Sequence, residues 1–208
     1  MESNLLQKGL EALSLSPSPE QLGQLETMVD EIMFFNPTYR LVSNTDRDEI
    51  IIRHILDSAS AVPYFISEGK TEIVDLGTGA GFPGLVLAVF LTSGITLCER
   101  MTRRVNFLKG LIPRMGLANV TVDSRSAEDI DRKFDIVTSR AFHPLVDCYS
   151  YMSLLKKDGG KIVLYKAGEE SINDELRALK AKGCSPTSSI LELKVPFLNE
   201  KRNLLILD

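Results

Sequence analysis

The spacing of apolar residues divides the chain into a helical N-terminal part and a longer part with two alternating periods. Three stretches carry apolar residues at every third or fourth position, which predicts amphipathic helices; these are 5–13, 20–35 and 46–60. Ser18 stands where the second helix would be capped. Because the residue before a proline is disfavoured in the α region, we expect this helix to end at Asn36–Pro37.

From Thr71 onward, short apolar runs bounded by glycine or acidic residues alternate with segments of helical spacing. The runs are EIVDLG, ITLCER, NVTVDS, FDIVTSR and GKIVLYKA. This alternation is typical of parallel strands joined by right-handed crossovers, and so predicts a doubly wound α/β sheet. SSILELKV and NLLILD have no helix between them, which predicts an antiparallel pair at the sheet edge. We therefore expect a helical extension over 1–70, packed on one domain over 71–208.

Composition narrows the function classes. The chain has 208 residues, 44% hydrophobic and 25% charged, with no apolar run near bilayer length, which indicates a globular protein rather than a membrane protein. Its three cysteines form no C-x-x-C and its two histidines lie apart, so we expect no metal site. The start lacks the order of a signal peptide, which predicts a cytoplasmic protein. With a net charge of −4, any nucleic acid would have to bind a local basic patch.

The stretch IVDLGTGAGFPG (73–84) fits two ligand templates. Gly79 begins a G-x-G-x-x-G dinucleotide fingerprint, whereas Asp75 begins a D-x-G-x-G-x-G loop for S-adenosylmethionine (SAM). In a dinucleotide fold the first glycine ends the strand directly, and a carboxylate at Asp75 would repel pyrophosphate. The same carboxylate could hold the ammonium group of a methionine, so we favour SAM, although a turn or helix cap is the alternative. Pro83 suits the first turn of a helix over 84–91.

Later strand ends supply further cofactor candidates. Glu99 follows the second strand, where a carboxylate can accept both ribose hydroxyls; it could instead be a solvated charge beside Arg100 and Arg103. SRSAEDI (124–130) follows the third strand, where SAM folds bind adenine, although its acidic residues could equally cap a helix. Thr138, Ser139 and Arg140 end the fourth strand and should face the reaction site.

The residues that two other kinds of base methylation require are absent from the required places in the sequence. No N-P-P-Y or D-P-P-Y, the motif of enzymes that methylate amino groups of adenine and cytosine, occurs in the chain. No cysteine ends the fourth strand, where methylation of pyrimidine C5 needs a nucleophile.

The ordered motifs resemble the RsmG family, formerly called glucose-inhibited division protein B (GidB). They are RHILDS, VDLGTGAGFPG, ITLCERMTRRVNFL, SRSAED, VTSRAF, GKIVLYKA and EKRNLLIL, and the match runs from about Phe35 to the end. Members are bacterial methyltransferases acting on N7 of a guanine in small-subunit (16S) ribosomal RNA. The resemblance implies a class I SAM-dependent methyltransferase fold, with Rossmann-like topology.

The resemblance also implies positions that contact SAM, which are Gly77, Phe82, Ala127, Glu128 and Arg140. With the residues favoured above, the candidate cofactor site is Asp75, Gly77, Gly79, Gly81, Phe82, Glu99, Ala127, Glu128 and Arg140. Many members have a lysine followed directly by glycine where this chain reads YKAG (165–168), which leaves the role of Lys166 open. The first ~20 residues match poorly, so the N-terminal helix has no assigned role.

Guanine N7 carries a lone pair and no proton, so the reaction needs no general base. We expect an in-line displacement that depends on positioning, with Arg140 and Lys166 as positioning candidates. The candidate RNA contacts, Arg or Lys aimed at phosphates plus one planar ring, are Arg53, His54, Arg103, Arg104, Arg125, Lys166 and Arg202. His54 could instead pack within its helix, and Arg103 and Arg104 could pair with Glu99. Phe142 could stack on a base or belong to the core.

The expected partner is small-subunit ribosomal RNA or an assembling small subunit, bound by a monomer. Three other functions stay open at this point. The enzyme could methylate another RNA, a small molecule or a protein; the chain could be a non-catalytic SAM-fold binding module; or it could be an NAD-dependent oxidoreductase. The last is the least favoured, since no Tyr or His ends a strand to handle a proton.

Overall fold

A computed structural model of the chain describes residues 5–43, 46–141 and 143–208. It contains one seven-stranded sheet of order β3-β2-β1-β4-β5-β7-β6. The strands are β1 (Glu72–Leu76), β2 (Gly94–Cys98), β3 (Val120–Asp123), β4 (Phe134–Arg140), β5 (Lys156–Lys166), β6 (Ser188–Leu193) and β7 (Arg202–Leu207). The first five are parallel, and β7 pairs antiparallel with both β5 and β6. The predicted doubly wound sheet with antiparallel C-terminal strands is therefore confirmed.

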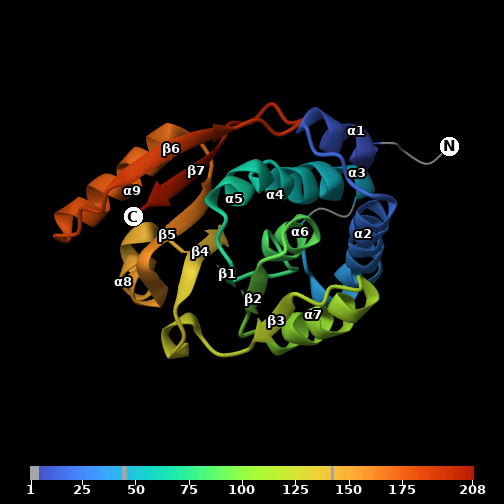
Figure 1. Ribbon diagram of the computed structural model, residues 1–208, viewed down its shortest axis with the longest axis horizontal. Helices are drawn as coiled ribbons and strands as arrows, with labels where there is room; N and C mark the ends of the chain where they lie inside the picture. Colours follow the sequence, from blue (N-terminus) through green and yellow to red (C-terminus); the bar gives the residue numbers. More distant parts are fainter. Residues whose placement is uncertain (1–4, 44–45, 142) are drawn as a thin grey trace.

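Helices cover both faces of this sheet. They are α1 (Leu5–Ala12), α2 (Pro19–Tyr39), α3 (Arg47–Ile50), α4 (Asp57–Ala59), α5 (Val62–Glu68), α6 (Gly84–Phe90), α7 (Thr102–Arg114), α8 (Leu145–Leu155) and α9 (Glu169–Ala181), with a π-helix η1 (Ile51–Leu56) and a 3₁₀ turn η2 (Ala127–Asp129). Figure 1 shows α1–α5 curving past α6 on one side, while α8 and α9 lie on the other.

Alternate residues of each strand supply two separate cores. Ile73 of β1 belongs to the cluster formed with α1, α2 and α4–α7, whereas its neighbour Val74 belongs to the cluster formed with α8 and α9. Leu204 and Leu205 of β7 divide in the same way. This period of two follows from the pleat of a strand. Because both faces of the sheet are covered by helices, the carboxyl ends of the parallel strands are where a ligand can approach.

The N-terminal helices differ from the prediction in detail. Ser18 caps α2 through a reciprocal pair with Gln21, as expected from the sequence. The predicted end at Asn36–Pro37 is wrong, because α2 continues to Tyr39 with Pro37 inside its last turn. Asn36 closes this end of the helix, since its carbonyl accepts a hydrogen bond from the Arg40 amide at 2.9 Å and its side chain accepts one from the Val42 amide at 2.9 Å.

The helix predicted over 46–60 is not a continuous α-helix, because its middle part is a π-helix. It runs as α3, then η1, then α4, with its apolar residues buried as predicted. The close approach of α1 is possible because Gly9 lacks a Cβ, which would lie 2.3 Å from a methyl carbon of Leu56. π turns are frequent at functional sites, and here the wider turn brings both Arg53 and His54 to one cleft. The sequence reading missed α5 altogether.

Candidate functional site

Two joined hollows lie at the carboxyl ends of the parallel strands. The larger one, of about 1340 Å³, lies between the glycine loop, η1, the end of β4 and the starts of α8 and β7. The smaller one, of about 270 Å³, lies between the ends of β2 and β4 and the turn η2. Gly77, Arg104, Ala141 and His143 line both. One ligand bound over Gly77 would therefore reach from one hollow into the other.

The glycine loop has a backbone that only glycine adopts readily. Gly77, Gly79 and Gly81 have φ angles of 66°, 62° and 103°, in the left-handed region. At Gly81 a Cβ would lie 2.3 Å from a methyl carbon of Leu85, so the position also needs the absence of a side chain. The loop exposes bare backbone to the cleft. Pro83 does not lie in the first turn of α6 as predicted, but directly before it, after a cis peptide bond.

Asp75 is wholly buried and holds this loop together. Its Oδ2 accepts hydrogen bonds from the Thr78 hydroxyl at 2.6 Å and from the Gly84 amide at 2.8 Å. Burial is the main reason that the pKa of its carboxyl is raised to about 7. The cap weighed as an alternative is therefore present. Oδ1 is buried with no hydrogen-bond partner among the described residues, and Asp75 lines neither hollow.

Glu99 is 5% exposed and lies between the glycine loop and the smaller hollow. Its two oxygens accept hydrogen bonds from the Gly79 amide at 3.1 Å and the Met101 amide at 2.8 Å. Arg104 approaches the same carboxylate at 3.6 Å, so the predicted pairing exists for Arg104. Ala127 and Glu128 line the same hollow from η2.

These residues suit a ligand with a nucleoside at one end and a positive charge at the other. The smaller hollow offers the Glu99 carboxylate beside buried Cys98 and Ala127, which suits a sugar edge next to an apolar ring. The bare backbone of Gly77 joins it to the larger hollow. A pyrophosphate would meet the negative charge of Glu99 beside the loop, so SAM fits better than a dinucleotide.

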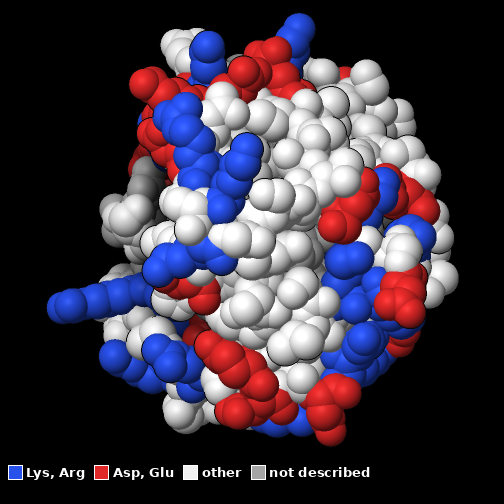
Figure 2. All heavy atoms as spheres, turned by 90° about the vertical axis from the view of Figure 1, so that its left-hand side faces the viewer, with Lys and Arg blue, Asp and Glu red and all other residues white. Residues whose placement is uncertain are grey.

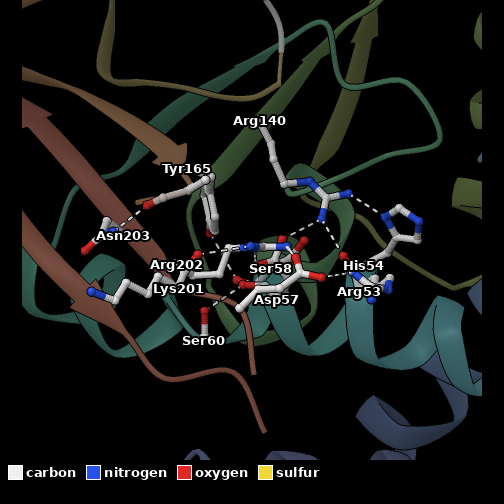
Figure 3. Close-up of polar contacts among 12 residues, drawn as sticks. Arg53, His54, Asp57, Ser58, Ser60, Arg140, Tyr165, Lys201, Arg202 and Asn203 are labelled. Atoms are coloured by element: carbon white, nitrogen blue, oxygen red, sulfur yellow. Dashed lines mark hydrogen bonds and ion pairs between the residues drawn. The ribbon is translucent and has the colours of Figure 1, made fainter. Parts of the chain in front are cut away.

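Arg140, at the end of β4, is fixed by contacts with η1 and α4 (Figure 3). Its guanidinium donates to the Asp57 carboxylate at 2.7 Å and the Arg53 carbonyl at 2.9 Å, and contacts His54 Nδ1 at 2.8 Å. It also lies 5.1 Å from the centre of the Phe82 ring. The side chain is 17% exposed, and its charge is compensated by Asp57.

His54 is held in one protonation state by these contacts. Burial, together with the charges of Arg140 and Arg53, lowers its pKa to about 3, so the ring is neutral at ordinary pH. Because a guanidinium can only donate, Nδ1 accepts and the proton belongs on Nε2. The ring stacks on Phe82 with centroids 5.1 Å apart. With its acceptor nitrogen occupied, His54 is poorly suited to act as a base.

Five of the seven predicted RNA contacts line the larger hollow, and each meets a carboxylate or another side chain there. They are Arg53, His54, Arg104, Lys166 and Arg202. Arg125 lines only the smaller hollow and pairs with Asp123 and Asp131, whereas Arg103 lines neither. Phe142 lies outside the described residues. From the side of α8 and α9, Figure 2 shows Lys and Arg interspersed with Asp and Glu around a neutral centre.

Several cleft residues were missed from the sequence. Asp57 and Tyr165 form the floor, and the Tyr165 hydroxyl donates to the Ser58 carbonyl at 3.0 Å. Glu200 lies at the rim, and His143 lines both hollows just after β4. No histidine ends a strand, as expected, but His143 reaches the site from three residues beyond the end of β4. Asp57 and Glu200 could have been found from the sequence, because Asp57 belongs to the motif RHILDS and Glu200 to the motif EKRNLLIL.

Neither a metal-binding cluster nor a membrane-spanning helix is present in residues 5–43, 46–141 and 143–208. No cluster of three or more His, Cys, Asp or Glu side chains among them could hold a metal ion. Likewise, none of the helices in those ranges is both long and apolar enough to cross a membrane.

Comparison with known proteins also indicates a methyltransferase. A family model described as GidB, rRNA small subunit methyltransferase G, matches residues 21–206. A relative from Treponema denticola named ribosomal RNA small subunit methyltransferase G is 36% identical over 100% of this chain and 95% of its own.

Solved structures share the fold at low identity. A putative O-methyltransferase from Klebsiella pneumoniae superposes with a TM-score of 0.62 at 15% identity, over 99% of this chain and 96% of its own. A magnesium protoporphyrin IX methyltransferase from Synechocystis, solved with bound SAM, gives 0.59 at 14% identity, over 87% and 96%. The family match confirms the resemblance found in the motifs, and the chain belongs to the rRNA small subunit methyltransferase G (GidB) family.

Proposed function

We propose that this protein transfers a methyl group from SAM to N7 of a guanine in small-subunit ribosomal RNA. The family match over residues 21–206 supports ribosomal RNA as the substrate. The observation that carries the proposal is the continuity of the two hollows across Gly77. The smaller hollow has room for a nucleoside, and the larger one is open enough for a nucleotide of an RNA strand to enter from outside.

SAM, the cofactor of this fold class, supplies a methyl group on a positively charged sulfur. Glu99 would hold its ribose, the backbone around Ala127 and Glu128 its adenine, and the loop from Gly77 to Phe82 its methionine part. Asp75, which lines neither hollow, would contribute by holding this loop in place through Thr78 and Gly84. These residues would hold the methyl donor at the mouth of the larger hollow, where positioning would lower the barrier to transfer.

The side chains facing that mouth suit a reaction without a general base. The lone pair of guanine N7 can take a methyl group with no proton to remove. His54 is neutral and its Nδ1 is occupied by Arg140, so neither group would extract a proton. Methylation leaves the base positively charged, and Asp57 offsets the charge of Arg140 beside it. The flat faces of His54 and Phe82 would exclude water from the methyl group.

The test is transfer of labelled methyl from SAM to small-subunit RNA taken from cells that lack this protein. We expect 7-methylguanosine as the product, identified by mass spectrometry of nucleosides. Naked RNA and assembled particles are compared in the same assay. Label in another nucleoside, or in protein only, would contradict the proposal.

The cofactor assignment has its own test in Glu99→Gln. Loss of a charged acceptor for two hydroxyl groups should weaken SAM binding by about ten- to a hundredfold in calorimetry. Asp158→Asn is the matched control, because Asp158 is exposed near the start of β5, at the end of the strands away from the cleft. Equal affinities for the two variants would contradict the role of Glu99.

We further propose that the enzyme works in the cytoplasm as a monomer. We also propose that residues 1–70 are an extension of the catalytic domain over 71–208 and not a domain that folds alone. Residues of α1 and α2 share one apolar cluster with α7 of the catalytic domain, which supports this assignment.

A further inference from the structure

One carboxylate bridges two of the arginines predicted to contact RNA. An oxygen of Glu200 accepts a hydrogen bond from Arg53 at 2.7 Å, and its other oxygen accepts one from Arg202 at 2.9 Å. Arg53 comes from η1 and Arg202 opens β7, so two distant segments of the chain meet at Glu200, which lies 147 positions after Arg53. All three line the larger hollow.

The two carboxylates that contact Arg202 differ in exposure. The side chain of Asp57 is 5% exposed; it approaches the Arg202 guanidinium at 3.2 Å and also binds Arg140 (Figure 3). Glu200 is 50% exposed and belongs to the irregular connection between β6 and β7. Removing Asp57 would leave buried guanidinium groups unpaired, whereas Glu200 can turn outward into water at little cost. Asp57 therefore fixes Arg202, and Glu200 is the exchangeable partner.

We propose that Arg53 and Arg202 form a clamp for one phosphodiester of the RNA backbone, which Glu200 closes until a phosphate displaces it. The inference rests on the proposed function only in that the ligand is RNA. A phosphodiester presents two anionic oxygens on one atom, as a carboxylate does, so it can accept from both guanidinium groups at once. Asp57 stays in place and keeps Arg202 directed at the phosphate.

The clamp gives the cleft selectivity against incidental RNA. A strand that cannot reach deeper contacts must still displace Glu200, so its net gain from Arg53 and Arg202 is small. Only RNA that also fills the cleft gains enough to open the clamp. Hydrogen bonds from Arg53 and Arg202 lower the pKa of Glu200, so this exchange depends on the competing anion and not on protonation at neutral pH.

The experiment measures binding of a polyuridylate oligomer to the full-length protein at several salt concentrations. We expect Glu200→Gln to bind about two- to fivefold more tightly and to show a salt slope steeper by about 0.7. Asp158→Asn loses the same charge far from the cleft and should match the natural protein. In an Arg53→Gln background the gain from Glu200→Gln should be smaller, because only Arg202 is then released, and an oligomer with an uncharged methylphosphonate backbone should show no gain.

A Glu200→Gln variant that binds no more tightly than Asp158→Asn would overturn the clamp. So would a gain that is undiminished with Arg53→Gln, or one that persists with the uncharged backbone. Methylation of small-subunit RNA by the same preparations separates this outcome from the proposed function. Normal methylation with no gain in binding rejects the clamp alone, whereas a gain in binding without any methylation rejects the proposed function alone.

Discussion

The buried carboxyl of Asp75 gives a sharp prediction about stability. Burial raises its pKa from 3.8 to about 7, so this group keeps its proton in the folded protein where an unfolded chain loses it. A raised folded-state pKa means that the stabilising contribution is complete below the unfolded value and is lost as the pH rises through the folded value. Asp75→Asn removes this titration while keeping an oxygen that can accept from Thr78 and Gly84.

The magnitude follows from one proton. Between about pH 4.5 and 6.5 the unfolding free energy of Asp75→Asn should rise relative to the natural protein by about 1.4 kcal/mol per pH unit, or about 3 kcal/mol in all. His54 acts in the opposite direction, since its pKa is lowered to about 3 and its contribution grows as the pH rises towards its ordinary value of 6.5. The natural protein should therefore show a flat profile where the two offset each other, and the variant a rising one.

Urea unfolding followed by circular dichroism, repeated across this pH range, measures the difference. Comparison of the two proteins at each pH cancels the titration of all other groups. Parallel profiles from about pH 4.5 to 7.5 would refute the reasoning, because they would mean that Asp75 ionises normally in the folded state.

Two further predictions concern the loop and the end of β4. Gly81→Ala should destabilise the protein by about 2–4 kcal/mol in urea unfolding, because φ is 103° and the new Cβ would clash with Leu85. Gly23→Ala is the control; it has open space inside α2 and should stabilise by about 0.5–1 kcal/mol, so equal effects would contradict the loop geometry. Arg140→Lys keeps the charge but loses the fork that contacts Asp57 and His54 through its two nitrogens, and should lower kcat about tenfold or more with little change in SAM affinity. An unchanged kcat would contradict the positioning role.

The fold was predictable because its signals are local. Alternation of apolar runs and helix-spaced segments specified the parallel strands, and the absence of a helix near the end specified the antiparallel pair. The π-helix η1 was not predictable, because its apolar spacing is equally compatible with an α-helix. The end of α2 was misplaced because Pro37 is accommodated in the last turn, and the helix ends at Tyr39, beyond which the Asn36 side chain accepts from the Val42 amide.

The site was predictable only where a residue's position in the loop or at a strand end fixes its direction. Glu99, Gly77 and Arg140 satisfy this condition. Asp57 does not, since its importance depends on Arg140, 83 residues away, reaching it across the sheet edge. Such pairs arise from packing of distant segments, which no local pattern encodes. For the same reason the pairing of Glu200 with Arg53 and Arg202 was not foreseen, whereas that of Glu99 with Arg104, close in the sequence, was.

The central claim is the identity of the methylated group, and mass mapping of modified nucleosides tests it most directly. Small-subunit ribosomal RNA is compared between cells with and without this protein. We predict that one 7-methylguanosine disappears on deletion and returns when the natural protein, but not Glu99→Gln, is restored. A full set of 7-methylguanosines in the deleted cells would contradict the account.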